Sequence, residues 1–550
     1  MTIAIVDIET DSINAKLIHC IVARSYRSNK IKTWVGEECK EFVEWSKQID
    51  EFIMHNGISF DAPILNKLIG CDIKVNQIRD TLIESQLYNP NREGGHSLEA
   101  WGEKLKYNKG KFNDFENYSE DMLEYCKRDT ELTRMVAVKL EKEGKKFSKK
   151  SYKLECKVRA IIDKQQNNGF AFKLREAMIL QAQLQDELQS LAKKAEEEFE
   201  PTEVVLKTKT KYIPFNIASR KQIAERLKAK GWKPSEKTDK GNIIINEKVL
   251  NSIIEDSSID LPEAKMFNRY FLLQKRTGLL KSWINECQED NRVRGKVMTL
   301  RTITGRMAHA LPNMAQVPAV YSPYGRECRD LWTVDDQSKY RLVGVDASGL
   351  ELRCLAHYMD DPEYTDIVLT GDVHKANQEK AGLKTRDQAK TFIYSFLYGA
   401  GAAKIGKIVN GNAKKGQQLI TKFLKNMPAL EQLRTDVLDW SSNGTITALD
   451  GRLLYVRSEH SALNTLLQGA GAIICKQWLV HIMERVIKAE LDVRLVASIH
   501  DEYQFEVAIP HIERFCKLAK EAMTQTTKTL NMKCELDCDY KIGKTWAETH

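Results

Sequence analysis

The sequence predicts a multidomain protein of mixed α/β and α+β class. The chain has 550 residues, which is long enough for two or more domains with cores of their own. Predicted strands alternate with helices over residues 1–140, whereas residues 151–295 show mostly helical periodicity. Strand patterns return from residue 296, and the chain closes on a long helix, a β-hairpin and a final helix. This order indicates sheet-based parts separated by a helical part.

The N-terminal region opens on an apolar strand that carries Asp7 and Glu9, two residues apart and therefore on one side of the strand. Asp61 follows, and then Tyr125 and Asp129, four residues apart. Four carboxylates and a tyrosine suit a two-metal hydrolytic site, in which a metal-bound water attacks a phosphodiester. Each fragment alone could be an ordinary strand or helix end, so the prediction rests on the combination.

The helical middle of the chain contains two basic clusters, and the whole chain has a formal net charge of +8. The first cluster, residues 139–157, is interpreted as a solvated face or linker after the N-terminal domain. The second, residues 207–233, includes a predicted helix that begins after Ser219. Its lysines and arginines suit contacts with nucleic-acid phosphates that do not depend on base sequence, and a solvated face or linker is the alternative.

A second candidate site combines two segments of the C-terminal half. In residues 340–353 a buried-type strand ends at Asp346 and a helical pattern follows. Two apolar segments flank His500-Asp501-Glu502, which predicts a tight hairpin with carboxylates at its tip. Asp346 and Asp501 could bridge two Mg²⁺ ions roughly 3.5–4 Å apart, as in-line phosphoryl transfer requires. The alternatives are a helix N-cap for Asp346 and an ordinary acidic turn for the hairpin.

A predicted helix between these two segments carries two cations and then two aromatic residues, each four positions apart on one face. They are Arg386, Lys390, Tyr394 and Tyr398. Two charges followed by two rings suit a triphosphate that leads to a sugar and a base. A solvated basic face with buried tyrosines is the alternative. The following Gly399-Ala-Gly401 does not indicate a dinucleotide site, because Lys404 stands at the third glycine position.

These segments together resemble motifs A, B and C of the family A (polymerase I type) DNA polymerases, and in particular the replicative polymerases of short-tailed bacteriophages. The resemblance covers nearly the whole chain. The further matching segments are Thr304-Gly305-Arg306, Leu311-Pro312-Asn313 with Gln316, Asp450-Gly451-Arg452, Asn464 to Gln468, and the ending with Trp546 and His550. The resemblance implies a template-directed DNA polymerase with a right-hand architecture of palm, fingers and thumb.

The resemblance implies roles for the matching residues of the polymerase site, whose expected substrates are primer–template DNA and dNTPs. Asp346 and Asp501 would bind two Mg²⁺ ions, or Mn²⁺, with Glu502 as an auxiliary. The residues expected to bind the incoming nucleotide are Arg386, Lys390, His374, Tyr394, Glu351 and Tyr398. The residues expected to contact DNA, several of them in the minor groove, are Arg306, Gln468, His500, Asn313 and Gln316.

Four of these roles are specific. Arg386 and Lys390 would hold the triphosphate, with Lys390 as proton donor to pyrophosphate. Glu351 would crowd the ribose 2′ position and exclude ribonucleotides. A tyrosine at position 394, unlike phenylalanine, implies tolerance of dideoxynucleotides.

The N-terminal set resembles the DEDDy 3′–5′ exonuclease domain, an RNase H-like proofreading domain that precedes the polymerase in this family. All expected positions are filled, so the resemblance implies an active site with two Mg²⁺ ions that accepts single-stranded DNA. Asp7, Glu9, Asp61 and Asp129 would bind the ions, and Tyr125 would orient the nucleophilic water. An intact-looking site that its loops disable is the alternative.

The expected domains are an exonuclease over residues 1–145 and a polymerase over residues 146–550. The expected polymerase subdomains are the thumb at about 176–295, the palm at about 296–375 and 456–550, and the fingers at about 376–455. Since the proofreading strand begins at residue 3, the 5′-nuclease domain of bacterial relatives is expected to be missing, which favours replication over nick translation.

Polymerases of this phage branch can carry a long thumb insertion that captures host thioredoxin as a processivity factor. Only about a dozen residues, Pro201 to Lys211 among them, occupy the corresponding gap, so thioredoxin is not expected as a partner. A phage helicase–primase and a single-strand binding protein are possible partners.

The composition excludes some other classes. The 12 cysteines include no C-x-x-C pair, which favours reduced thiols over a zinc site. The sequence has no apolar run of about 18 residues that would span a membrane. The first residues already form the predicted strand, so no targeting signal is expected. The expected location is the cytoplasm of an infected bacterial host.

Three other functions are considered. A single-subunit RNA polymerase shares the aspartate motif, the cationic helix and the His-Asp hairpin, but would not be expected to carry Glu351 or the N-terminal carboxylates. A repair polymerase of the same family is the main alternative. A non-catalytic remnant would bind DNA without turnover.

Overall fold

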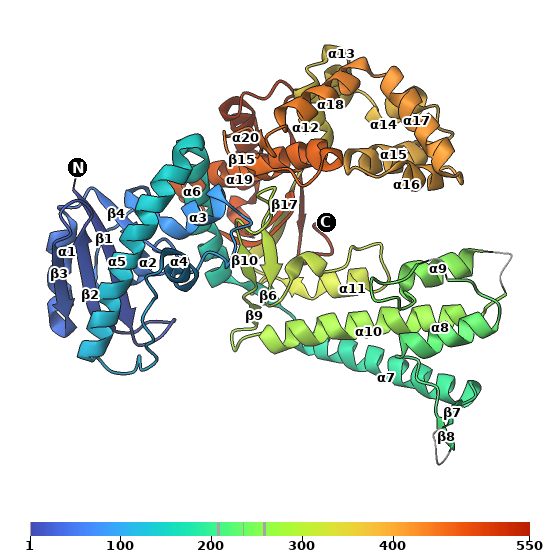
Figure 1. The fold of residues 1–550 in the computed structure, drawn as a ribbon, viewed down its shortest axis with the longest axis horizontal. Helices are drawn as coiled ribbons and strands as arrows, with labels where there is room; N and C mark the ends of the chain where they lie inside the picture. Colours follow the sequence, from blue (N-terminus) through green and yellow to red (C-terminus); the bar gives the residue numbers. More distant parts are fainter. Residues whose placement is uncertain (1, 206–209, 235, 257–259) are drawn as a thin grey trace. The chain divides into compact units, whose positions relative to one another are not determined.

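The chain folds into two compact units, each assembled from segments far apart in the sequence. The computed structural model describes residues 2–205, 210–234, 236–256 and 260–550. The first unit comprises Met1–Asn168, Lys296–Ala310 and Lys339–Ile542, and the second comprises Gly169–Gly295, Leu311–Ser338 and Gly543–His550 (Figure 1). The predicted domain borders remain predictions.

The N-terminal part of the first unit is built on a five-stranded sheet with the order β3-β2-β1-β4-β5. Its strands are β1 (Ile3–Thr10), β2 (Ile18–Ser25), β3 (Ile31–Val35), β4 (Glu51–Met54) and β5 (Ile78–Asp80). β2 pairs antiparallel with β1 and β3, whereas β4 pairs parallel with β1 and β5. The predicted alternation of strands and helices in this region is confirmed.

Helices bury this sheet. They are α1 (Phe42–Ser46), α2 (Asp61–Ile69), α3 (Thr81–Tyr88), α4 (Leu98–Leu105) and α5 (Glu120–Glu143). The long helix α5 packs on β1, β2 and β4, and β2 is buried along almost its whole length. A strand covered in this way is mostly apolar, so the carboxylates of β1 need a specific reason to be there.

A second, four-stranded sheet of the first unit has the order β16-β17-β13-β18. Its strands are β13 (Tyr340–Ala347), β16 (Val493–Ile499), β17 (Glu502–Ala508) and β18 (Cys538–Gly543). The helices around it are α6 (Lys149–Asn168), α12 (Leu350–Met359), α19 (Ala462–Lys488) and α20 (Ile512–Thr529). Trp478 of α19 is fully buried and donates its Nε1–H to the Ala519 carbonyl oxygen at 2.9 Å. The predicted strand, hairpin, long helix and closing helix are confirmed.

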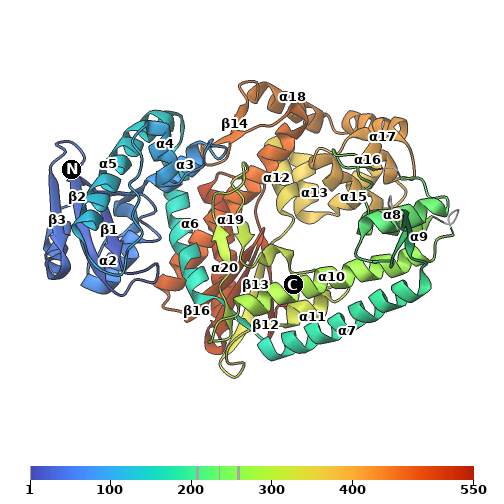
Figure 2. The same ribbon diagram turned by 60° about the horizontal axis from the view of Figure 1, so that its bottom comes forward.

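Residues between these strands form a group of helices that lie together in both views of the ribbon (Figures 1 and 2). They are α13 (Pro362–Thr370), α14 (Val373–Ala381), α15 (Arg386–Leu397), α16 (Ala402–Lys407), α17 (Ala413–Lys425) and α18 (Pro428–Trp440). The hydroxyl of Thr385 caps α15 by accepting from the Gln388 N–H at 3.2 Å. A helix and not a strand precedes Gly399, which agrees with rejection of the dinucleotide site.

Two small two-stranded sheets complete the first unit. They are formed by β10 (Lys296–Met298) with β11 (Ala308–Ala310), and by β14 (Thr445–Thr447) with β15 (Leu453–Tyr455). The second pair positions the Asp450-Gly451-Arg452 turn.

The second unit is mostly helical, as predicted for residues 151–295. Its helices are α7 (Leu174–Glu198), α8 (Arg220–Ala229), α9 (Glu247–Glu255), α10 (Glu263–Glu286) and α11 (Gly325–Asp330). Its strands are β6 (Phe170–Phe172), β7 (Thr202–Val205), β8 (Thr210–Ile213), β9 (Arg292–Val293) and β12 (Trp332–Thr333). The predicted Ser219 cap is present, since its hydroxyl accepts from the Gln222 N–H. Lys207 and Lys209 of the predicted basic cluster lie outside the described residues.

None of the described helices is both long enough and apolar enough to cross a membrane.

Candidate active sites

The first candidate site lies where β13 ends beside the β16–β17 hairpin. Asp346 is opposite Glu502 in the strand register, and the Ala347 N–H donates to the Asp501 carbonyl oxygen at 3.1 Å. The hairpin tip is His500-Asp501, with His500 in the left-handed region at φ 57°. The N-cap of α12 is Gly349, so the helix-cap alternative for Asp346 is wrong. Backbone pairing therefore brings the two aspartates together, as predicted.

The carboxylates of this site repel one another. Loss of hydration and, second, the charge of Asp501 raise the pKa of Asp346 to about 7. Burial and the charge of Glu351 raise the pKa of Asp501. Glu502 is buried and accepts a hydrogen bond from Gln504 Nε2 at 2.5 Å. Carboxylate oxygens that resist ionisation together are a donor set suited to hard divalent cations.

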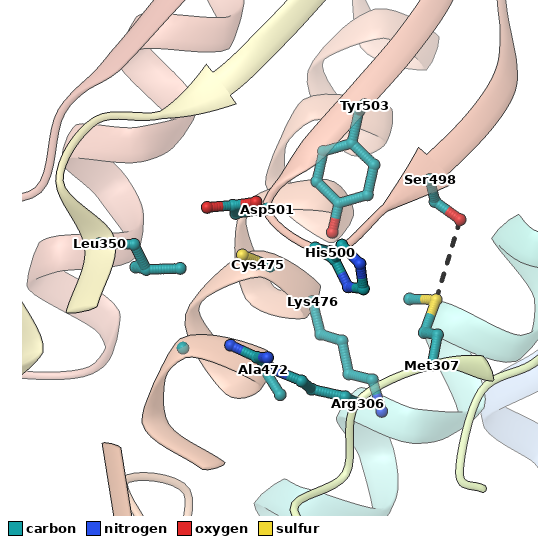
Figure 3. Close-up of a pocket in the computed structure, with 11 residues that line it drawn as sticks. Arg306, Met307, Leu350, Ala472, Cys475, Lys476, Ser498, His500, Asp501 and Tyr503 are labelled. Carbon is teal, nitrogen blue, oxygen red and sulfur yellow. Dashed lines mark hydrogen bonds between the residues drawn. The ribbon is translucent and has the colours of Figure 1, made fainter. Parts of the chain in front are cut away.

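A small cavity of about 30 Å³ lies behind Asp501. In Figure 3, His500, Asp501 and Tyr503 come from the hairpin and Cys475 from α19, while Arg306 approaches from a separate segment. The predicted DNA-contact residues Arg306 and His500 thus line one cavity with a predicted catalytic aspartate.

The residues predicted to bind a nucleotide cluster on α15 and its neighbours. Arg386 at the start of α15 pairs with Asp372, Nε to Oδ2, at 2.8 Å. The rings of His374 and Tyr394 lie 6.0 Å apart. Lys390 is exposed on the same helix. The opposite part of α15 is anchored by buried phenylalanines, so Arg386 and Lys390 lie on the exposed side of the helix.

Glu351 of α12 connects the end of α15 to the segment that carries Arg306. Its Oε1 accepts from the Tyr398 hydroxyl at 3.1 Å and lies 3.6 Å from Arg306 Nη2. Tyr398 is 44% exposed, which disagrees with the alternative of buried tyrosines on a merely solvated helix.

The lining of the cavity behind Asp501 does not include the other three predicted DNA-contact residues. Gln468 of α19 donates to Asn464 Oδ1 at 2.8 Å. Asn313 and Gln316 belong to the second unit, where Asn313 caps the short helix Met314–Gln316. Their contact with DNA remains a prediction.

The second candidate site lies on β1 and the helices beside it. Asp7 and Glu9 come from β1, Asp61 from the start of α2, and Asp129 from α5. Burial, and then the charges of Asp129 and Glu9, raise the pKa of Asp7 well above its ordinary value. Burial and the charge of Asp129 raise the pKa of Glu9 to about 8. The fold thus forces together the four carboxylates that the sequence singled out.

Two further observations show that cations suit this second site. The buried Asp129 Oδ1 has no hydrogen-bond partner among the described residues. Ligand atoms of Asp7, Glu9 and Cys126 all lie within 4.8 Å of one another. The Cys126 thiol donates to Asp7 Oδ2 at 3.4 Å. An orphaned buried oxygen among acidic groups fits a divalent ion.

The comparison with known families decides the identity of the chain. The sequence pattern of DNA polymerase family A matches residues 183–548. The chain belongs to DNA polymerase family A. The matched range contains Asp346 and Asp501, whereas Asp7 and its partners lie outside it, so the N-terminal site of this family A polymerase rests on its own geometry.

Two phage proteins are similar over nearly the whole chain. The DNA-directed DNA polymerase of Enterobacteria phage T3 is 30% identical, covering 99% of both chains. The DNA-directed DNA polymerase of Escherichia phage T7 is 31% identical, covering 90% of this chain and 92% of its own. Among solved structures, the POL domain of Pol1 from M. smegmatis, in complex with DNA primer–template and dNTP, has a TM-score of 0.83 at 17% identity, covering 99% of this chain and 96% of its own. That likeness shows a shared fold.

Sequence reasoning missed several charged residues at these sites in the family A polymerase. Glu155 of α6 accepts from Arg452 Nη1 at 2.6 Å and from Lys476 Nζ at 2.7 Å, all three fully buried. Arg452 also binds Asp450 at 2.6 Å. Partners 297 and 321 residues apart leave no local sequence signal. Cys126 and Lys109 at the N-terminal site were also missed. Cys126 contacts Asp7, which is 119 residues away, and Lys109 lies in a segment without a helix or strand.

The raised carboxyl pKa values predict how pH affects the metal-free N-terminal site. The folded-state pKa of Glu9 (about 8) exceeds its ordinary 4.5, so the stability that its bound proton provides is lost as pH rises from about 4.5 to 8. In EDTA, a variant with Asp7→Asn and Glu9→Gln should match the wild-type Tm at pH 5 and exceed it by a few degrees at pH 8, since about 1 kcal/mol shifts the Tm of a 150–250-residue domain by roughly 2–4 °C. Calorimetry at both pH values measures this, and an equal Tm difference at pH 5 and pH 8 would contradict it.

Proposed function

We propose that this family A polymerase copies phage DNA by extending a primer on a template with dNTPs and removes mispaired 3′ ends in its N-terminal site. The observation that carries the proposal is the convergence of Asp346 and Asp501 at one end of the palm sheet, beside a helix that presents Arg386 and Lys390. The similarity to phage DNA-directed DNA polymerases over nearly the full chain supports the template and substrate.

The chain's own residues have distinct tasks in the proposed synthesis. Asp346 and Asp501 would hold two Mg²⁺ ions, which would activate the primer 3′-hydroxyl and neutralise charge on the pyrophosphate. Arg386 and Lys390 bind the triphosphate, and Lys390 donates a proton to the leaving pyrophosphate. Tyr394 stacks on the nucleotide sugar.

Selectivity in the proposed mechanism depends on shape. Closure of α15 over a matched pair assembles the site, whereas a misshapen pair does not. Tyr398 borders the templating base, and Arg306, Gln468 and His500 contact the primer end or minor groove, where every base pair offers acceptors.

In the proposed proofreading reaction, a frayed primer end enters the N-terminal site as single strand. Asp7, Glu9, Asp61 and Asp129 would hold two Mg²⁺ ions, and Tyr125 would orient the attacking water. The buried carboxylates with raised pKa values and the sheet order β3-β2-β1-β4-β5 support a nuclease domain of the RNase H type.

Thioredoxin is not part of the proposal. The segment between α7 and α8 includes β7 and β8, and residues 206–209 between these strands lie outside the described residues. This short connection supports a polymerase that does not capture thioredoxin, so its processivity would be low or would come from a different partner.

A labelled primer–template incubated with Mg²⁺, with and without four dNTPs, tests both activities. Extension with dNTPs and shortening without them are expected. Shortening in both reactions would contradict DNA synthesis by the chain alone. Addition of candidate phage and host proteins would then show whether synthesis requires a partner protein.

The position of Glu351 predicts sugar selection. With its carboxylate held by the Tyr398 hydroxyl at 3.1 Å, Glu351→Ala should open space for a ribose 2′-hydroxyl and reduce discrimination against rNTPs by roughly tenfold or more. Single-nucleotide incorporation of dNTP and rNTP measures the ratio of kcat/KM. Tyr398→Phe removes the hydrogen bond to Glu351 but keeps its carboxylate, so it should reduce discrimination less. Glu363→Ala, at an exposed position, serves as the control. Unchanged discrimination in Glu351→Ala would disprove the steric role.

A further inference from the structure

Lys109 places a positive charge within the N-terminal carboxylate cluster. Its Nζ lies 2.8 Å from Asp129 Oδ2 and 4.9 Å from the ring centroid of Tyr125. The Asp129 side chain is only 3% exposed and that of Lys109 28%. One ammonium therefore contacts both α5 residues of the proposed exonuclease site.

The segment that carries Lys109 is fixed on both sides. Arg128 Nε donates to the Asn108 carbonyl oxygen at 2.6 Å, and the ring of Phe112 lies 5.7 Å from that of Tyr125. A Cβ at Gly110 would meet Tyr125 Cδ2 at 3.2 Å, which is closer than ordinary contact. Because the backbone on both sides of Lys109 packs closely against α5, the position of this backbone directs the Lys109 side chain to Asp129.

The two oxygens of Asp129 are in different environments. Oδ2 binds Lys109, whereas the buried Oδ1 has no hydrogen-bond partner among the described residues. Lys109 thus engages one oxygen and leaves the other available to a cation. A charged lysine beside the four carboxylates also reduces the negative charge that attracts divalent ions.

We propose that Lys109 is a positioning residue of the exonuclease site, which holds Asp129 and Tyr125 in place for hydrolysis and competes with divalent cations for the carboxylates. This inference rests on the proposed exonuclease function. It makes two predictions of opposite sign, because loss of the ammonium strengthens metal binding and yet weakens catalysis.

The first readout is metal binding by the DNA-free full chain. In a background of Asp346→Asn and Asp501→Asn, bound Mn²⁺ reports the N-terminal site. Lys109→Met should bind Mn²⁺ about threefold more tightly or better by calorimetry, because a repulsive charge a few ångströms away is removed. Lys109→Arg should stay near wild type.

The second readout is degradation of a labelled single strand at saturating Mg²⁺. Lys109→Met should lower kcat by roughly tenfold or more, whereas Lys109→Arg should retain most of it. Lys111→Met, an exposed lysine two positions along the same segment, is the matched control for both readouts. Thermal unfolding of each variant excludes a loss of fold.

The outcomes separate the two proposals. Unchanged kcat in Lys109→Met, or Mn²⁺ binding that is unchanged or weakened, would overturn the role of Lys109. If the wild-type chain does not degrade DNA, the proposed exonuclease function fails, and the Mn²⁺ comparison alone then decides whether Lys109 competes with the ion.

Discussion

Asp501→Asn should abolish primer extension while single-strand degradation continues at the wild-type rate. The substitution keeps the size of the side chain at the hairpin tip but removes one of the two charges proposed to hold cations. Loss of such electrostatic stabilisation at a reacting phosphate typically costs roughly 10²–10³-fold in rate. Asp346→Asn should have the same effect, because the backbone bond from Ala347 to Asp501 joins both carboxylates in one site.

Asp492→Asn is the matched control for this experiment. Asp492 lies next to the same hairpin but at the opposite end of β16, where its Oδ2 accepts from the Tyr340 hydroxyl at 2.7 Å. Extension by this variant should match wild type. Residual synthesis within about tenfold of wild type in Asp501→Asn would refute the assignment of the aspartates, because a metal ligand at the reacting phosphate contributes more than that.

The converse result is expected at the N-terminal site. The double variant Asp7→Ala with Glu9→Ala should lose degradation of single-stranded DNA and retain primer extension. Both side chains come from β1 and face Asp129 across a buried cluster, so their removal takes away half of its carboxylates. Release of labelled nucleotides in Mg²⁺ without dNTPs measures the loss, which should again reach roughly 10²–10³-fold.

Asp11→Asn provides the control, since Asp11 follows the same strand but binds the Lys16 and Leu17 N–H groups at 2.9 and 3.0 Å on the surface. It should retain degradation. Persistent degradation in the double variant would contradict this assignment. A contaminant would be excluded if that activity coelutes with the double-variant chain in gel filtration.

Local sequence predicted the elements of the polymerase site well. The strand that carries Asp346, the hairpin around Asp501 and the helix from Arg386 are each encoded within about twenty residues by apolar periodicity, turn residues and a threonine cap. Strand ends and hairpin tips expose side chains in a fixed direction, which is why the carboxylate positions could be inferred. The roles of Asn313 and Gln316 were inferred from resemblance alone and remain predictions.

The sequence by itself determined the positions of the carboxylates, the order of the elements and the family, because these depend on local periodicity and on matching motifs. Only the tertiary structure decided which charged side chains pair with one another. Glu155 meets Arg452 and Lys476 across about 300 residues, and Lys109 reaches Asp129 from a loop without regular structure. The two charges of a buried ion pair must lie within a few ångströms of one another. Periodicity along the sequence does not give the distance between side chains in the folded protein.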